Sequence, residues 1–179
     1  SAVVYQGAIK DLLYDYKYRG RRSVVYTLFD LLRRIYARER LLQQTDGMTY
    51  VPLHAGRLQE RGFNQAEELA RMLAKWANKP LLHGLIRQTA TGKLSKMGRW
   101  ERLASMQGAF HAGKRTAFTR WTWLGREMTV FSDHAIWKGR RILLIDDVYT
   151  TGGTVNDCAR ELLATGASSV RVLTIARAV

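Results

Sequence analysis

The chain has 179 residues, 46% of them hydrophobic, so it can bury one substantial core and leaves no room for a second large domain. Its formal net charge of +14 exceeds what solubility requires and indicates a polyanionic partner, either nucleic acid or a pyrophosphate-bearing substrate. No apolar run reaches the ~18 residues that span a bilayer, and the first residues lack a signal-peptide pattern, so we expect no membrane insertion and a cytoplasmic location.

Helical and strand patterns alternate through the first half of the chain. Apolar residues at helical spacing predict a helix over residues 7–18, ended by the basic turn 19–22, and a second helix from Ser23 to about Leu42. The elements expected next are a short strand, a loop, a helix and another strand, over residues 49–53, 54–62, 64–76 and 81–86. With a last strand over 170–175, this order predicts an α/β fold with a mostly parallel sheet covered by helices on both faces.

The middle of the chain is strongly basic. From Arg87 to Arg126 there are nine Lys or Arg residues and one acid, Glu101, whereas a solvated surface normally mixes its signs. Residues 87–110 show no clear period and are expected to form a flexible loop, and residues 113–138 an insertion that includes a β-hairpin.

Three tryptophans, Trp100, Trp121 and Trp123, are interleaved with these basic residues and match a stacking platform for single strands. The hydrophobic face of a hairpin explains Trp121 and Trp123 equally well. The residues that we expect to contact nucleic acid are Arg99, Arg102, Lys114, Arg115 and Arg120.

The most informative stretch is residues 142–154, Ile-Leu-Leu-Ile-Asp-Asp-Val-Tyr-Thr-Thr-Gly-Gly-Thr. The first four residues predict a buried strand, and residues 154–163 predict a helix opened by a threonine cap, with the only cysteine, Cys158, on its buried side. The loop between them suits an anion, because the first N–H groups of a helix lack internal partners. The sequence argues against a Walker A loop, since that loop needs a lysine where Gly153 stands.

This loop is expected to hold both ends of a pentose phosphate. The carboxylates of Asp146 and Asp147 are placed to accept hydrogen bonds from sugar hydroxyls or to orient the waters of Mg²⁺, and we regard them as the candidate catalytic pair. The expected phosphate-binding residues are Thr150, Thr151, Gly152, Gly153 and Thr154. The segment resembles the 5-phosphoribosyl 1-pyrophosphate (PRPP) signature of type I phosphoribosyltransferases, with four apolar residues, two acids, and Thr-Gly-small-Thr after two intervening residues.

Further motifs narrow the resemblance. Val51-Pro52-Leu53-His54 and Arg61-Gly62-Phe63-Asn64-Gln65 are similar to the signature of the competence protein F (ComF) family, and Tyr16-Lys17-Tyr18 and Gly108-Ala109-Phe110 to its N-terminal and post-loop segments. The resemblance implies one type I phosphoribosyltransferase-like domain over residues 1–179, with residues 1–45 as an N-terminal helical segment. It also implies a role in DNA uptake, with single-stranded DNA as a partner and other competence proteins as further candidate partners.

Two departures from the family pattern bear on function. Family members commonly begin with a four-cysteine zinc module, and this sequence supplies no such ligands, so we expect no zinc in this chain. The flexible loop departs at two places: Gly92 and Lys93 stand before Leu94 where the family has a glutamine, and Arg102 or Ser105 stands where it has an asparagine. These loop changes put catalysis in question more than the fold.

The resemblance also implies roles around the sugar. The residues that would receive the pyrophosphate, bridged by Mg²⁺, are His54, Ala55, Gly56, Arg57 and Arg61, and Lys93 and Lys96 would close over the site. Alternatives remain open: His54 as an ordinary loop histidine, and Arg61 to Asn64 as a helix entry with Asn64 as N-cap. Tyr149 either stacks on an aromatic ring or covers the edge of the core.

Three functions fit these expectations. The first is a competence factor that binds PRPP or ribose 5-phosphate and single-stranded DNA, and we favour it because of the surplus charge and the altered loop. The second is an active Mg²⁺-dependent phosphoribosyltransferase with an unknown acceptor. The third is a PRPP-sensing regulator whose DNA binding shifts when PRPP is added.

Overall fold

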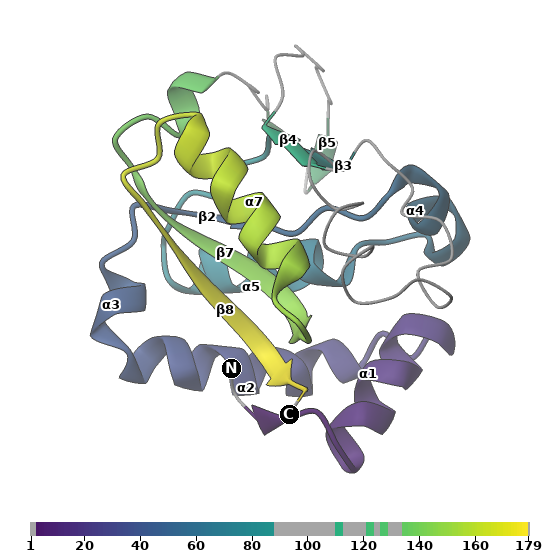
Figure 1. Ribbon diagram of the computed structural model, residues 1–179. Coiled ribbons are helices and arrows are strands. Elements are labelled where there is room, and N and C mark those ends of the chain that lie inside the picture. Colours follow the sequence, from purple (N-terminus) through teal and green to yellow (C-terminus); the bar gives the residue numbers. More distant parts are fainter. Residues whose placement is uncertain (1–2, 88–109, 113–120, 124–125, 129–133, 179) are drawn as a thin grey trace.

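Four parallel strands form the central sheet of the computed structural model, which describes residues 3–87, 110–112, 121–123, 126–128 and 134–178. Each neighbouring pair of strands is parallel, as the sequence predicted, and β7 and β8 stay paired from Arg141 and Ser169 to Tyr149 and Arg177. The strand order across the sheet is β1 (Val3–Val4), β8 (Ser169–Arg177), β7 (Arg141–Tyr149) and β2 (Gly47–Tyr50) (Figure 1).

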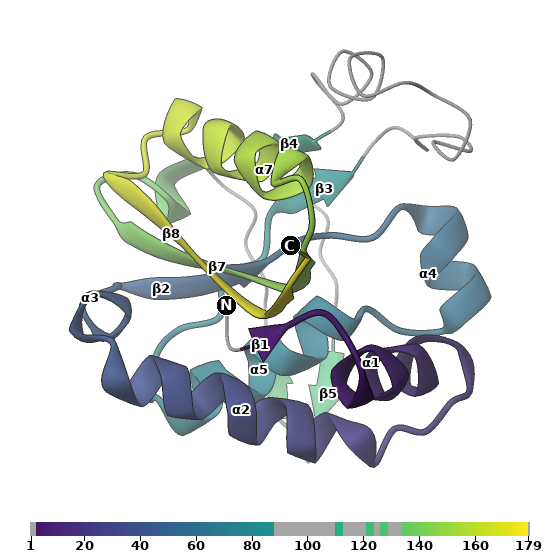
Figure 2. The same cartoon turned by 60° about the horizontal axis from the view of Figure 1, so that its bottom comes forward.

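Helices cover both faces of this sheet (Figure 2). One face carries α1 (Ala8–Tyr18), α2 (Val24–Arg38) and α5 (Gln65–Trp76), and the other carries α7 (Gly153–Ala164). Successive strand residues point to opposite faces, so Leu143 and Ile145 enter the core under α1, α2 and α5, whereas Ile142 and Leu144 enter the core under α7. Both faces of β7 are therefore buried, which explains its continuous apolar run.

The predicted helices are confirmed except near position 39. The second helix ends at Arg38, because Glu39 takes an extended backbone conformation (φ −99°, ψ 96°), and a short separate helix, α3 (Arg40–Gln43), follows. Ser23 precedes α2, but its side chain makes no capping hydrogen bond.

Two other local predictions were wrong. The segment predicted as a loop over 54–62 contains a helix, α4 (Ala55–Arg61), and none of its seven residues is buried. The strand predicted over 81–86 is split: Leu81 bridges to Met48 beside β2, and only β3 (Leu85–Arg87) forms further on, antiparallel to β4 (Phe110–Ala112). Gly84 (φ +151°) lies at the break, where a Cβ would be 3.0 Å from the buried Trp137 ring.

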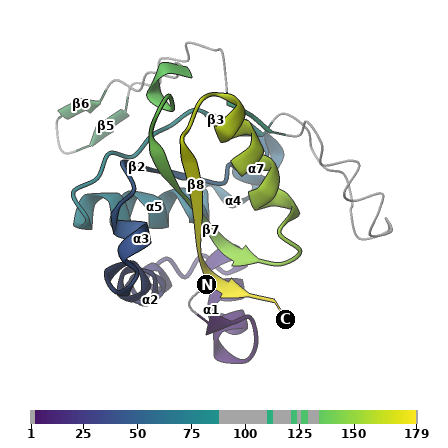
Figure 3. The ribbon, with the colours of Figure 1, turned by 60° about the vertical axis from the view of Figure 1, so that its left-hand side comes forward.

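The hairpin expected in the insertion is confirmed for the residues that the structure describes there. Strands β5 (Trp121–Trp123) and β6 (Arg126–Met128) pair antiparallel and form a two-stranded sheet separate from the central one (Figure 3). A 3₁₀ turn over His134–Ile136 then leads towards β7. Among the described helices, none combines the length and the apolar character that crossing a bilayer requires.

Candidate functional site: the carboxyl end of the central strands

The acidic pair, the small-residue loop and the start of α7 meet at the carboxyl end of β7. Asp146 and Asp147 are half-buried in the strand itself, and Thr150 and Thr151 are exposed in the turn after it. The residue before α7 is Gly152, and no side-chain cap bonds to the first N–H groups of the helix. The predicted threonine cap was therefore wrong, since Thr154 lies inside the first turn; the glycine leaves those backbone donors facing the loop.

Tyr149 lies directly against the phosphate loop. A Cβ on residue 152 would be 2.3 Å from the Tyr149 hydroxyl oxygen, and Gly152 has φ +82°, a left-handed conformation. The Tyr149 ring also packs at the edge of the core under α7, with the Arg177 guanidinium 5.3 Å from its centroid. Of the two alternatives for Tyr149, this geometry corresponds to covering the core edge.

The two carboxylates have different surroundings. The Asp147 carboxylate forms an ion pair with Lys17 of α1, with 2.7 Å between Nζ and Oδ2 and only 18% and 14% of the two side chains exposed. The Asp146 carboxylate accepts a hydrogen bond from the Asp147 backbone N–H (2.9 Å). Loss of solvent around Asp146, followed by the charge of Asp147, raises the pKa of the Asp146 carboxyl well above its usual range.

The segment expected to receive pyrophosphate follows the neighbouring strand. β2 lies beside β7, and the Val51 N–H extends the pairing by donating to the Ile145 carbonyl (3.0 Å). His54 is the N-cap of α4, where its Nδ1 accepts a hydrogen bond from the Gly56 N–H at 3.2 Å. Ala55, Gly56 and Arg57 form the exposed first turn of α4, close to the same edge of the sheet as the acids.

Arg87 joins this group, although the sequence had placed it only within the basic block. Burial lowers the pKa of the Arg87 guanidinium, the positive charge of Arg57 lowers it further, and the negative charge of Asp146 opposes both effects. Arg87, Arg57 and Asp146, which come from β3, α4 and β7, are thus close enough to interact electrostatically. The Arg87 guanidinium also lies 5.2 Å from the centre of the Phe110 ring.

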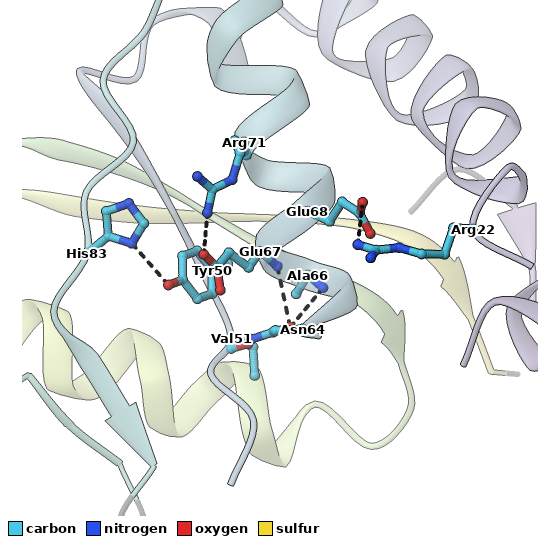
Figure 4. A network of polar contacts seen from close by, with 9 residues as sticks. All are labelled: Arg22, Tyr50, Val51, Asn64, Ala66, Glu67, Glu68, Arg71 and His83. Atoms are coloured by element: carbon cyan, nitrogen blue, oxygen red, sulfur yellow. Dashed lines mark hydrogen bonds and ion pairs between the residues drawn. The ribbon is translucent and has the colours of Figure 1, made fainter. Parts of the chain in front are cut away.

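Arg61 and Asn64 make specific contacts at the entry to α5. Asn64 is the N-cap: its Oδ1 accepts from the Ala66 and Glu67 N–H groups, and its Nδ2 donates to the Val51 carbonyl at 3.0 Å (Figure 4). The cap that the helix-entry alternative predicted is confirmed. The Arg61 guanidinium donates to the hydroxyl of Tyr18 (2.9 Å) and to Oε1 of Gln65 (3.1 Å).

The remaining predicted positions lie outside the described residues. These are the loop residues Lys93 and Lys96 and the nucleic-acid candidates Arg99, Arg102, Lys114, Arg115 and Arg120. Within the described part of the chain, no three His, Cys, Asp or Glu side chains gather in a way that could hold a metal ion.

Known proteins resemble the chain in both sequence and fold. The phosphoribosyl transferase domain family matches residues 101–178. "Competence protein ComFC" of Bacillus subtilis is 31% identical over 99% of this chain and 63% of its own length, and "DNA utilization protein YhgH" of Escherichia coli is 29% identical over 97% and 69%. The structure of glutamine PRPP amidotransferase from B. subtilis superposes with a TM-score of 0.51 over 85% of this chain and 26% of its own, at 17% identity.

The fold is that of type I phosphoribosyltransferases, and the acidic pair lies at the carboxyl end of its central strand β7. The similarity in sequence is more specific than the similarity in fold, because it extends over nearly the whole chain. Besides "Competence protein ComFC", "Competence protein F" of Haemophilus influenzae is 27% identical over 93% of this chain and 67% of its own length. The chain is therefore similar over nearly its whole length to competence-related proteins, and it spans 63–69% of the length of these relatives.

Proposed function

We propose that this protein binds PRPP or ribose 5-phosphate together with Mg²⁺, and that it binds single-stranded DNA during DNA uptake. The observation that carries the proposal is the meeting of Asp146 and Asp147 with the N-terminus of α7, whose first N–H groups have no side-chain cap. The backbone around Gly152 and Gly153 would hold the 5-phosphate, and the two acids would hold the ribose hydroxyls. Relatives named for competence and for DNA utilization support the DNA part.

The donor set fits Mg²⁺ that arrives with its ligand. Mg²⁺ usually keeps several waters and binds through one or two carboxylates and substrate phosphates. The Asp147 carboxylate already pairs with Lys17, so water-mediated contacts from the acidic pair suit the ion better than direct coordination. When bound, the ion would neutralise the pyrophosphate; Arg57 would add positive charge from the protein.

Calorimetry of PRPP with Mg²⁺ tests the sugar-phosphate site. We expect micromolar to millimolar binding by the wild type and at least a tenfold loss for Asp147→Asn, because two charge-assisted hydrogen bonds to the sugar are weakened. The matched control is Asp46→Asn, which removes the same charge at the opposite end of β7, where Asp46 pairs with Arg141. Equal affinities for the wild type and Asp147→Asn would contradict the site.

The surroundings of Asp146 favour a second candidate, an active phosphoribosyltransferase. A carboxyl with a raised pKa is able to exchange a proton near neutral pH, which suits acid–base chemistry beside the anomeric carbon. Pyrophosphate release from PRPP in the presence of nucleobases and Mg²⁺ would support turnover, whereas binding without release would favour the competence factor. If added PRPP shifts the affinity for a labelled oligonucleotide, the protein is a PRPP sensor.

A further inference from the structure

An exposed pair of tyrosines marks the outer surface of α1. Tyr14 and Tyr18 are 51% and 56% exposed, one helical turn apart, with their ring centroids 5.0 Å apart and their planes tilted by 43°. Neither side chain belongs to the buried core or packs against it. Two large aromatic rings held together in solvent need a reason other than folding.

Arginines surround these rings. The Arg19 guanidinium lies 5.5 Å from the centre of the Tyr14 ring, and the Arg61 guanidinium 4.8 Å from that of Tyr18, to whose hydroxyl it donates. Arg21, with 65% of its side chain exposed, completes the group. Below, we use the term α1 platform for these five residues, Tyr14, Tyr18, Arg19, Arg21 and Arg61.

The charge of the α1 platform is positive and its geometry is fixed. A single carboxylate, Asp15, accepts from Arg19 at 3.0 Å and from Arg21 at 2.9 Å, so one negative charge orients two guanidiniums and leaves a positive surplus. Farther along the turn, Arg22 pairs with Glu68 of α5 at 3.0 Å, which anchors the turn to the domain (Figure 4). Guanidiniums that are already ordered beside exposed rings lower the entropic cost of binding an anionic ligand.

We propose that the α1 platform binds single-stranded nucleic acid, with bases stacked on Tyr14 and Tyr18 and phosphates paired with Arg19 and Arg21. This proposal rests on the proposed function and places its DNA contact on residues outside the basic block. Aromatic stacking requires free base faces, which single strands offer and duplexes hide, and guanidiniums add phosphate pairing and cation–π contact. The formal charge of +14 on the whole chain favours the same polyanionic partner.

The two tyrosine rings of the α1 platform are separable from the sugar-phosphate site, whereas Arg61 is also an expected pyrophosphate residue and is therefore left unsubstituted. Lys17, between the two tyrosines along α1, reaches Asp147, whereas the tyrosine rings remain in solvent. Substitutions at Tyr14 and Tyr18 should therefore leave PRPP binding unchanged, and the calorimetric PRPP titration serves as an internal control for folding.

Fluorescence anisotropy with labelled oligothymidylate tests the α1 platform. We expect the double variant Tyr14→Ala/Tyr18→Ala to bind about tenfold more weakly or worse, and Tyr14→Phe/Tyr18→Phe to retain most of the affinity because its rings still stack. The matched control is Trp76→Ala, which removes an aromatic residue of similar exposure (48%) that contacts Tyr36 at the far end of α2. An unchanged affinity in the alanine double variant, or an equal loss in Trp76→Ala, would overturn the proposal.

The salt dependence supplies an independent readout. Arg19→Gln/Arg21→Gln should make the slope of log affinity against log salt shallower by about 1.4, because each single-strand phosphate contact contributes about 0.7. Arg34→Gln is the control, since that arginine is equally exposed (64%) and also paired with a carboxylate, on α2. A slope that the Arg19/Arg21 variant leaves unchanged would contradict the assignment.

Other nucleic-acid probes and a second set of variants show whether the α1 platform alone is wrong or DNA binding as a whole is wrong. Oligouridylate and duplex DNA of the same length are the other probes, and a preference for duplex would overturn stacking. If charge reversal at Arg99, Lys114 and Arg120 weakens binding and the α1 platform variants do not, DNA binding stands and the α1 platform fails. If the wild type binds PRPP and no oligonucleotide, both the α1 platform and the DNA part of the proposed function fail.

Discussion

Two separate constraints fix the residue type at position 152. Its φ of +82° is strained for a side chain, and the place of a Cβ is taken by the Tyr149 hydroxyl, 2.3 Å away. We expect Gly152→Ala to lower the free energy of unfolding by about 1–3 kcal/mol. Urea denaturation measures the change. Introducing Tyr149→Ala as well removes the clashing ring, so a loss of the same size in both backgrounds would show that the contact does not matter.

The two acids Asp146 and Asp46 should respond to pH with opposite signs. The raised pKa of Asp146 means that the folded state binds a proton that the unfolded state has released, so this group costs stability as pH rises above about 4. Asp146→Asn should therefore raise the free energy of unfolding at pH 7 by about 1–2 kcal/mol, and the gain should vanish in acid. Urea denaturation at several pH values checks this.

Asp46 is the control with the opposite sign. Hydrogen bonds from Arg141 hold the pKa of the Asp46 carboxyl well below its usual range, so its contribution to stability is present above pH 4 and is lost as pH falls through the lowered pKa. Asp46→Asn should destabilise the protein at pH 7 and have no effect in strong acid. The same sign of change for both variants would refute the proposed environments.

At the residue scale, the sequence could locate the acidic pair and could not identify its partner. Asp146 and Asp147 come directly after the apolar run of β7, so the local sequence pattern is sufficient to place them. Lys17 is 130 positions away in the chain, and nothing in its own helical pattern distinguishes it from Lys10. The contact exists only because α1 packs beneath the sheet, which is a property of the tertiary fold.

At the scale of elements, the Lys17 ion pair joins α1 to the end of β7. We expect Lys17→Met to weaken PRPP binding about tenfold, because it removes a positive charge beside an anionic ligand, and to lower stability by about 1 kcal/mol or more, because Asp147 loses its partner. Calorimetry and thermal unfolding measure the two effects. Lys10→Met, at an exposed position on the same helix, should change neither. Unaltered PRPP affinity in Lys17→Met would restrict the pair to a structural role.

Asn64 connects two elements through one side chain. It caps α5 with Oδ1 and holds the end of β2 by donating Nδ2–H to the Val51 carbonyl (Figure 4). Asn64→Ala should cost about 2 kcal/mol of unfolding free energy, since both the cap and a buried hydrogen bond are lost. Asn64→Ser should cost less, because its hydroxyl keeps the cap. Thermal unfolding checks both against Asn156→Ala, an exposed position on α7; an equal cost for the three variants would contradict this role.

The predictability of an element depended on whether it buries a periodic face. β7 and α5 were predicted from their own residues, because buried apolar positions recur along them. α4 was missed, since none of its residues is buried; the His54 cap and Gly62, at φ +75°, define its two ends. The break at Glu39 was missed for the opposite reason, because apolar spacing continues through it although the backbone turns.

At the scale of the whole molecule, β7 and β8 supply side chains to both cores. Leu143 and Ile145 face the core under α1, α2 and α5, and Ile142 and Leu144 face the core under α7. Loss of packing on either face therefore disturbs the same two strands. Because the two cores share these strands, we expect them to unfold together as the single domain that the chain length predicts.

Cys158 provides a probe of that cooperativity. The thiol is fully buried under α7, and burial raises its pKa, so a disulfide reagent should label it only when the domain opens. Leu13→Ala, on the opposite face in α1, should speed labelling at least about thirtyfold, because a buried Leu→Ala change costs 2 kcal/mol or more and the whole domain opens together. Leu162→Ala, beside Cys158 in the α7 core, should act similarly, and the exposed Leu41→Ala should not. If Leu13→Ala lowered the urea midpoint and left the labelling rate unchanged, the two faces would unfold separately, and the single domain would be refuted.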